Sequence, residues 1–185
     1  TIKLCSSFIV FDNKTIIKLF GRLENNQSFV TLSEMKPYFF MEEKELKRFS
    51  KYLVKFKVEK TNLTSFEGKP VVKITFPNHT EMNKVYSAIH HGNHKLQFYE
   101  ADIKPHLKFI MDNNLLGSID IEGDYEPSEK VDRVYKNPKI TSAEFSPKLK
   151  IISMDIESDK KTSALFCIGI SGENYKKSFL ISDKE

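Results

Sequence analysis

Apolar and polar residues alternate along the first part of the chain. Three segments keep this period of two: SFIVFD (7–12), TIIKLFGRL (15–23) and SFVTLSEM (28–35). The pairs Asp12-Asn13 and Asn25-Asn26, which are typical of tight turns, separate them. Because side chains on a strand also have a period of two, the pattern predicts an antiparallel β meander at the amino end.

A strand followed by a helix is predicted next. KPYFFM (36–41) is a short apolar run, and in EEKELKRFSKYLVKF (42–56) apolar residues recur at helical spacing. Val58–Thr64 and Val71–Phe76 predict a hairpin around Glu67-Gly68. The apolar positions on one face of the predicted helix are Leu46, Phe49, Leu53 and Phe56.

A second short helix is expected after this hairpin, with Thr80 as its cap and Leu96–Tyr99 as the strand that follows. The resulting order βαββαβ from Tyr38 to Tyr99 is the ferredoxin-like arrangement, which RNA-recognition modules share. We therefore expect an α+β fold. The inward side of the second helix would carry Met82, Val85, Tyr86 and Ile89.

The amino-terminal domain is predicted to occupy residues 1–123. Pro105 is expected to open its last helix, Leu107–Leu115, which stops at Asn113-Asn114 and Gly117. Residues 124–147 contain three prolines and many charges, so they are expected to form an extended linker. The second domain would begin at residue 148.

Two carboxylates, Asp155 and Glu157, end the apolar strand in KLKIISMDIES (148–158). Residues i and i+2 share one face of a strand and lie roughly 6.6 Å apart along it. Such a pair suits hard divalent cations, as in phosphodiester hydrolases whose two metal ions lie about 4 Å apart. An acidic pair at a strand end is more often a solvated terminus, so the context of the pair matters.

That context is a run of apolar strands. The residues Ile151, Ile152, Met154 and Ile156 predict a central strand of a covered sheet. Two further strands, Ala164–Ile170 and Ser178–Ser182, follow after tight turns. Three consecutive antiparallel strands with acids at the tip of the first are expected at the opening of a ribonuclease-H-like exonuclease domain, here residues 148–185.

Several of these segments resemble a known family. KIISMDIES (150–158) resembles the first exonuclease motif of family B DNA polymerases. QFYEADIKPHLKFIMDNNLLGSIDIEG (97–123) resembles the segment that joins their amino-terminal domain to the exonuclease domain. The segment 97–123 and LFCIGISG (165–172) together are most similar to the bacterial polymerase II branch. Ser158 departs from the family pattern, because many relatives have threonine after the Asp-x-Glu pair.

The resemblance implies a fragment of an enzyme that extends a primer on DNA from deoxynucleoside triphosphates and hydrolyses mismatched 3′ ends. Asp155 would bind both Mg²⁺ ions of the 3′–5′ exonuclease site, and Glu157 would bind one ion and orient the water. The amino-terminal domain would help to hold the single-stranded template, and a sliding clamp is a candidate partner. In 185 residues there is no place for the later exonuclease motifs or the polymerase carboxylates, so the fragment alone is expected to be inactive.

Composition agrees with an intracellular globular protein. The net charge is +4, and only Arg22, Arg48 and Arg133 are arginines, so contacts to DNA phosphates are expected rather than base reading. Cys5 and Cys167 lie in apolar runs, as expected of reduced core thiols. No apolar run reaches the roughly 20 residues that span a bilayer. A cytoplasmic, nucleoid-associated protein is expected.

Two alternatives stay open from the residues. A stand-alone module could bind single-stranded nucleic acid by stacking bases on Tyr38 or Phe40, with Phe39 turned to the core. A stand-alone nuclease of the same superfamily is less favoured, because such enzymes carry the acidic motif near their start. Lysines of the first helix could follow a phosphate backbone, although a solvated helix face explains them equally well: Lys44, Lys47, Lys51 and Lys55.

A metal site at the histidines is not expected. His90, His91 and His94 cluster at the end of the second helix, but no cysteine or carboxylate completes a tetrahedral set at zinc-finger spacing. Positive side chains near a helix carboxyl end are explained by the helix dipole.

Overall fold

The computed structural model describes residues 2–90, 96–146 and 150–181. The chain forms two compact units, Thr1–Phe145 and Ser146–Glu185. None of the helices in the described ranges is long and apolar enough to cross a membrane.

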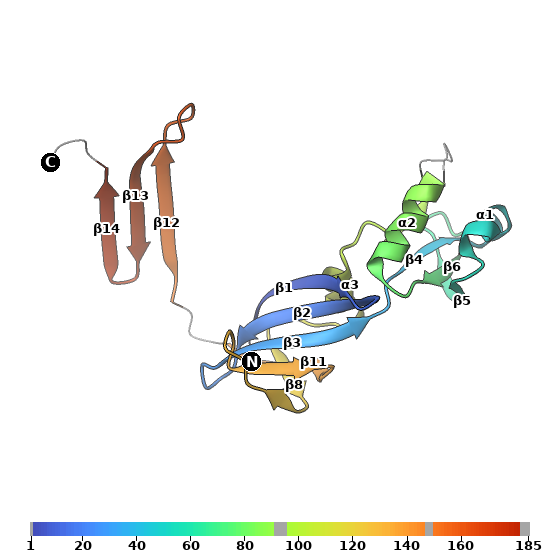
Figure 1. Cartoon of the computed structure of the whole chain (residues 1–185), viewed down its shortest axis with the longest axis horizontal. Helices are drawn as coiled ribbons and strands as arrows, with labels where there is room; N and C mark the ends of the chain where they lie inside the picture. Colours follow the sequence, from blue (N-terminus) through green and yellow to red (C-terminus); the bar gives the residue numbers. More distant parts are fainter. Residues whose placement is uncertain (1, 91–95, 147–149, 182–185) are drawn as a thin grey trace. The chain divides into compact units, whose positions relative to one another are not determined.

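The predicted meander forms the main part of a five-stranded sheet in the first unit (Figure 1). Its strands β1 (Ile2–Phe11), β2 (Lys14–Arg22) and β3 (Ser28–Met35) pair antiparallel in chain order. Asp12 and Asn13 both have positive φ, of 48° and 59°, which a two-residue hairpin turn requires. The meander prediction is therefore confirmed.

A second sheet of the first unit has the strand order β5-β6-β4-β7 and is antiparallel throughout. The elements follow the predicted order β, α, β, β, α, β along the chain. Their bounds are β4 (Tyr38–Glu42), a 3₁₀ turn η1 (Glu43–Glu45), α1 (Leu46–Leu53), β5 (Lys57–Thr64), β6 (Pro70–Thr75), α2 (His79–His90) and β7 (Phe98–Tyr99).

Strand β4 lies between two cores because its side chains alternate between the faces of this sheet. Phe39 and Met41 pack in a cluster with residues of α1 and α2. Tyr38 and Phe40 belong instead to a cluster with residues of β2 and β3. Both faces of β4 are thus covered, and all five of its residues are buried.

The cap of α2 differs from the prediction. Asn78, not Thr80, precedes the helix, and its Oδ1 accepts a hydrogen bond from the Glu81 backbone N–H at 2.9 Å. Asn78 is also held by the β1–β2 turn, since its Nδ2 donates to the Asn13 side chain at 2.5 Å. The tertiary contact selects Asn78 from two residues that both cap helices well.

The predicted linker at 124–147 is wrong for most of its length. Strand β10 (Arg133–Lys136) pairs in parallel with β3 and antiparallel with the two-residue β9 (Tyr125–Glu126), extending the first sheet. Strand β11 (Lys139–Ser142) pairs with β8 (Ile119–Glu122). Pro127 and Pro138 lie outside these strands, and the first unit runs to Phe145.

Asp132 fastens this segment to the first sheet. Its carboxylate accepts hydrogen bonds from the backbone N–H and the hydroxyl of Ser28, at 2.7 and 2.6 Å. Helix α3 (Pro105–Asp112) begins at the predicted proline and contacts β1 and β2.

The second unit is a three-stranded antiparallel sheet in the order β12-β13-β14. Its strands are β12 (Ile152–Ser158), β13 (Leu165–Gly172) and β14 (Tyr175–Leu180). The prediction of a covered central strand does not hold in the described residues, where β12 is an edge strand and Met154 is 64% exposed. Cys5 is exposed and Cys167 half-buried, so the prediction of core thiols is wrong for Cys5.

Candidate functional site

Asp155 and Glu157 lie on the same face of β12, as their spacing predicted. In the antiparallel pair with β13, Asp155 is opposite Gly169 and Glu157 is opposite Cys167. Directly opposed residues share a face, so this acidic face also carries Gly169 and Cys167. On β14, Ser178 is opposite Gly169 and adds a small polar residue to the same face.

The reverse face of this sheet is apolar. Ile156 pairs with Ile168 and Met154 pairs with Ile170, while Phe179 on β14 is opposite Ile168. Strand β14 adds Lys177 to this face, and it adds Lys176 and Leu180 to the acidic face. The two carboxylates nevertheless lie on the other side of the sheet from the large apolar side chains of β12 and β13. Only the acidic face is suited to a polar reaction.

The loop after the acids is fixed by a third carboxylate, Asp159. Its Oδ1 accepts hydrogen bonds from the backbone N–H of Lys161 and of Thr162, each at 2.7 Å, and from the Thr162 hydroxyl at 2.9 Å. The bonds from Thr162 and Lys161 lower the pKa of the Asp159 carboxyl. Asp159 thus has a structural role.

The carboxylate oxygens of the acidic face are largely open. One oxygen of Asp155 accepts a hydrogen bond from the Ile156 backbone N–H at 3.0 Å. Asp155 and Glu157 are both exposed. Within the described ranges, no group of three or more His, Cys, Asp or Glu side chains could hold a metal ion, so the chain offers two neighbouring oxygen-donor residues and not a complete set.

The rings of Tyr38 and Phe40, the predicted base-stacking residues, are buried. They are 9% and 8% exposed, and both pack in the core shared with the first sheet. Two covered rings offer no face to a nucleobase, so the stacking prediction is wrong for this structure. Alternation correctly placed Phe39 on the opposite, helix-covered face.

Tyr38 is held by a polar network that the sequence did not reveal. Its hydroxyl donates to Asp112 Oδ1 at 2.8 Å, and Lys108 Nζ lies 3.6 Å from its ring centroid. Lys108 is 3% exposed and donates to the Tyr38 carbonyl oxygen at 3.0 Å and to Glu100 Oε2 at 2.9 Å. Burial lowers the pKa of the Lys108 ammonium, against the opposing effect of Glu100. The network fastens the YEAD segment and α3 to β4.

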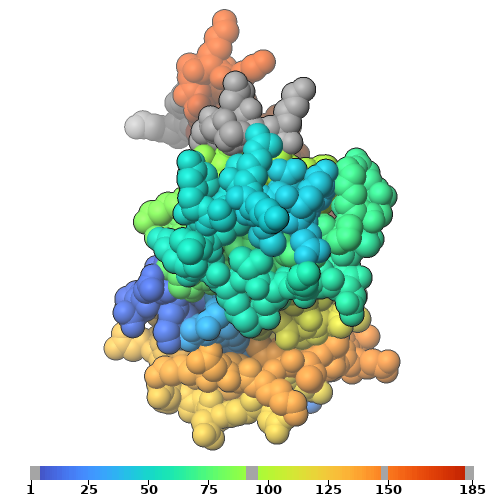
Figure 2. Space-filling model, turned by 90° about the vertical axis from the view of Figure 1, so that its right-hand side faces the viewer, coloured from blue at the N-terminus to red at the C-terminus, as the bar shows by residue number. Residues whose placement is uncertain are grey.

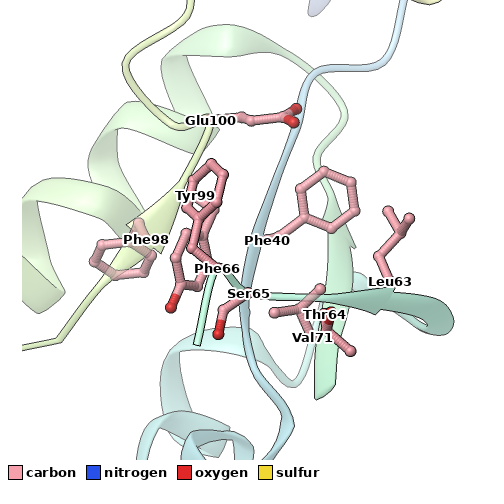
Figure 3. A pocket seen from close by; sticks show the side chains of 9 residues that line it. All are labelled: Phe40, Leu63, Thr64, Ser65, Phe66, Val71, Phe98, Tyr99 and Glu100. Atoms are coloured by element: carbon pink, nitrogen blue, oxygen red, sulfur yellow. The ribbon is translucent and has the colours of Figure 1, made fainter. Parts of the chain in front are cut away.

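A mostly apolar hollow of about 440 Å³ lies beside this network (Figure 3). Phe40 and Tyr99, a cross-strand pair, contribute to its wall. Phe66, at the tip of the β5–β6 hairpin, also lines it and is fully exposed. The other lining residues are Leu63, Thr64, Ser65, Val71, Phe98 and Glu100.

Two of the histidines enclose an aromatic residue of β1. The ring of Phe8 lies edge-on to His79, with centroids 4.9 Å apart, and is stacked on His106 at 5.7 Å. His90 stacks on Tyr86 at 5.4 Å, while His91 and His94 lie outside the described residues.

Comparison with known proteins places this arrangement in a family context. No protein-family model matches the chain. The chain is 26% identical over 118 residues to DNA polymerase II of Escherichia coli, a match that covers 63% of this chain and 14% of that protein. It also resembles the family B DNA polymerase of the archaeon Pyrobaculum calidifontis, with a TM-score of 0.70, 16% identity, and coverage of 98% of this chain and 26% of that one.

These similarities confirm the resemblance to the amino-terminal region of family B DNA polymerases. The structural match shows a shared fold for nearly all of the chain. The chain spans only 14% of the curated relative and 26% of the solved structure.

Proposed function

We propose that this chain is the amino-terminal part of a DNA-directed DNA polymerase with a 3′–5′ proofreading exonuclease. The observation that carries the proposal is the acidic face of β12, where Asp155 and Glu157 lie together on a chain whose fold matches a family B DNA polymerase over 98% of its length. DNA primer-template and deoxynucleoside triphosphates would be the substrates, and the protein would act at the nucleoid in the cytoplasm.

Strand order supports the domain assignments. The order β5-β6-β4-β7 with two helices on one face supports the ferredoxin-like assignment of residues 38–99. The three antiparallel strands of the second unit support its assignment as the opening of a ribonuclease-H-like exonuclease domain. In the intact enzyme the first unit would help to hold single-stranded template, and a sliding clamp remains a candidate partner.

The donor chemistry of the acidic face fits Mg²⁺, which prefers carboxylate oxygens. Asp155 and Glu157 would hold the metal from one strand, and bound Mg²⁺ would activate water and stabilise the leaving oxygen. Asp155 would hold both ions, and Glu157 would hold one ion and orient the attacking water. Gly169, opposite Asp155, would leave space for the terminal nucleotide, because a Cβ built there has no neighbour within 4 Å among the described residues.

The alternative of a stand-alone nucleic-acid-binding module is less well supported. RNA-recognition modules use aromatic residues on the open face of the sheet. In this chain the corresponding face of β4 is covered, with Tyr38 and Phe40 buried against residues of the first sheet.

The proposal is tested on the intact protein that contains this chain. Two activities, 3′–5′ degradation of a labelled primer and primer extension, are measured for the unmodified protein. They are measured again for a variant that lacks the carboxylates of Asp155 and Glu157. Selective loss of degradation supports the proposal, whereas an intact protein with neither activity overturns it.

A further inference from the structure

Two adjacent lysines of β14 lie on opposite faces of the sheet in the second unit. Lys177 belongs to the apolar face, where its Nζ lies 4.8 Å from the centroid of the Phe179 ring. Lys176 is opposite Ser171 on β13. Because side chains alternate along a strand, Lys176 lies on the acidic face together with Asp155. The acidic face therefore also carries a cation.

Lys176 is the one cationic residue on this face among the strand residues of the second unit. Strands β12, β13 and β14 contain two lysines, Lys176 and Lys177, and no arginine or histidine. The side chain of Lys176 is exposed and has no ion-pair partner within the described residues. Its ammonium group is therefore open to an anionic ligand.

Lys176 is close enough to the carboxylates to act on the same substrate. Its partner Ser171 is two residues from Gly169 on β13, and Gly169 is opposite Asp155. From the spacing of strands and residues in a sheet, the Cα atoms of Lys176 and Asp155 are about 10 Å apart across the strands and about 7 Å along them. The flexible four-carbon stem of lysine can bring the ammonium group toward a phosphate within this span.

Small side chains form the face between Lys176 and the carboxylates. Gly169 and Ser171 on β13 and Ser178 on β14 occupy this area. A Cβ built at Gly169 has no neighbour within 4 Å among the described residues. A chain of nucleotides could therefore cross the acidic face from Lys176 to Asp155 without meeting a bulky side chain.

A cation beside two carboxylates has a second explanation, which is neutralisation of their charge. Asp155 and Glu157 are both negative when ionised, and a cation on the same face reduces their mutual repulsion. A lysine with this role alone would not depend on the charge of any particular phosphate of the DNA. The two explanations therefore differ in a property of the substrate that can be changed.

We propose that Lys176 is a positioning residue of the exonuclease site and binds the second phosphate from the 3′ end of the DNA. The scissile phosphate, which is the last one, would lie at Asp155 and Glu157. The ammonium group of Lys176 would bind the preceding phosphate as a point charge. This contact would hold the strand on the acidic face with its 3′ end at the carboxylates. The inference rests on the proposed function and deepens it.

The test compares single variants of the intact protein. Lys176→Ala removes the proposed contact, and Lys176→Arg keeps the positive charge. Lys177→Ala is the matched control, because it removes the same charge from the next residue on the opposite face. Lys47→Ala removes a charge from α1, which lies on the surface of the first unit (cyan in Figure 2). Circular dichroism checks that all four variants fold.

Initial rates of 3′–5′ degradation of a 5′-labelled single-stranded oligonucleotide give kcat and KM. Lys176→Ala should raise KM by about tenfold and change kcat less than about threefold, because the contact is present both before and during the reaction. The slope of log KM against log salt concentration should decrease by about 0.7, as expected for one lost phosphate contact to a single strand. Lys176→Arg should restore KM to within about threefold, and both control variants should change it less than about twofold.

A modified oligonucleotide locates the contact. Its second linkage from the 3′ end is an uncharged methylphosphonate. We expect this change to raise KM by about tenfold for the unmodified protein and by less than about twofold for Lys176→Ala, since two changes to one contact are not additive. Equal effects on both proteins would overturn the inference, because Lys176 would then not bind that phosphate. An increase in KM for Lys177→Ala as large as that for Lys176→Ala would also overturn it.

The inference and the proposed function can fail separately. An unmodified protein that degrades the oligonucleotide, together with a Lys176→Ala variant of unchanged KM, would overturn the inference alone. An unmodified protein that does not degrade DNA from its 3′ end would overturn both.

Discussion

Asp155 on β12 lies directly opposite Gly169 on β13 in an antiparallel pair. A Cβ built at Gly169 meets no atom of the described residues within 4 Å, and the φ angle of Gly169 is not in the positive range. The fold therefore does not require glycine at this position. The absence of a side chain instead keeps the acidic face open beside Asp155.

This relationship predicts that Gly169→Val in the intact protein will fold normally and lose 3′–5′ exonuclease activity by about tenfold or more, since a misplaced terminal nucleotide is costly. Gly117→Val, also at a glycine with no neighbour within 4 Å, is the matched control in the first unit. Degradation of a labelled primer is measured for both variants. Full activity of Gly169→Val would show that the terminal nucleotide does not approach this face.

Removing both carboxylates should separate the two activities. Asp155→Ala with Glu157→Ala in the intact protein is expected to reduce 3′ degradation by several orders of magnitude and leave primer extension nearly unchanged, because catalysis through metals fails when their ligands are lost. Ser153→Ala, two residues before Asp155 on the same strand, is the control. An equal loss of both activities would assign these residues to folding or to the polymerase site.

The 185-residue chain by itself should neither extend nor shorten DNA. It supplies two carboxylates at the acidic face, and no group of three or more potential ligands occurs within the described ranges. A two-metal site of this type needs about four carboxylates. A 5′-labelled primer-template is incubated with Mg²⁺ and nucleotides, and any change in primer length above a buffer control would contradict the prediction.

Local signals in the sequence account for the elements that were predicted well. The meander follows from alternation together with a turn at Asp12 and Asn13, both of which adopt positive φ. The helix at Pro105 follows from proline at its first position. The position of Asp155 and Glu157 on one face follows from the two-residue period of side chains along a strand.

The errors in the first unit at the predicted linker and at Tyr38 share one physical origin, which is contact between distant residues. Strand β10 is four residues long and pairs with β3, and Asp132 bonds to Ser28 across 104 residues. No local pattern encodes such a pairing. Alternation likewise placed Tyr38 on one face of β4 but could not tell that the first sheet covers that face.

The histidines beside Phe8 should make the first unit sensitive to mild acid. Burial lowers the pKa of His79 and of His106. The unfolded chain therefore takes up protons near pH 6.5 that the folded chain does not, so stability is retained above this pH and decreases as the pH falls below it. Buried His106 Nδ1 has no hydrogen-bond partner among the described residues, so no acceptor is placed there for an added proton.

Thermal unfolding followed by circular dichroism at pH 7.5 and 5.5 measures this effect. The unfolding temperature should be lower at pH 5.5, and His106→Phe should reduce the difference because it keeps the ring stacked on Phe8. His90→Phe, at the end of α2, is the control. A pH dependence that His106→Phe leaves intact would exclude His106 as a source of this sensitivity.

Tyr38 is predicted to stabilise the fold and to have no role in binding DNA. Tyr38→Phe removes the hydroxyl that donates to exposed Asp112, so we expect a loss of about 0.5–1.5 kcal/mol in the free energy of unfolding, measured by urea titration. Binding of a single-stranded oligonucleotide should stay weak and salt-sensitive, around 10⁻⁴ M or poorer at physiological salt, and equal to that of the unmodified chain. Micromolar binding that Tyr38→Phe or Tyr38→Ala weakens would instead favour an independent recognition module. In that case Tyr38 would have to leave its buried position and expose its ring to a base. In this structure Lys108 and Asp112 hold the Tyr38 side chain in place.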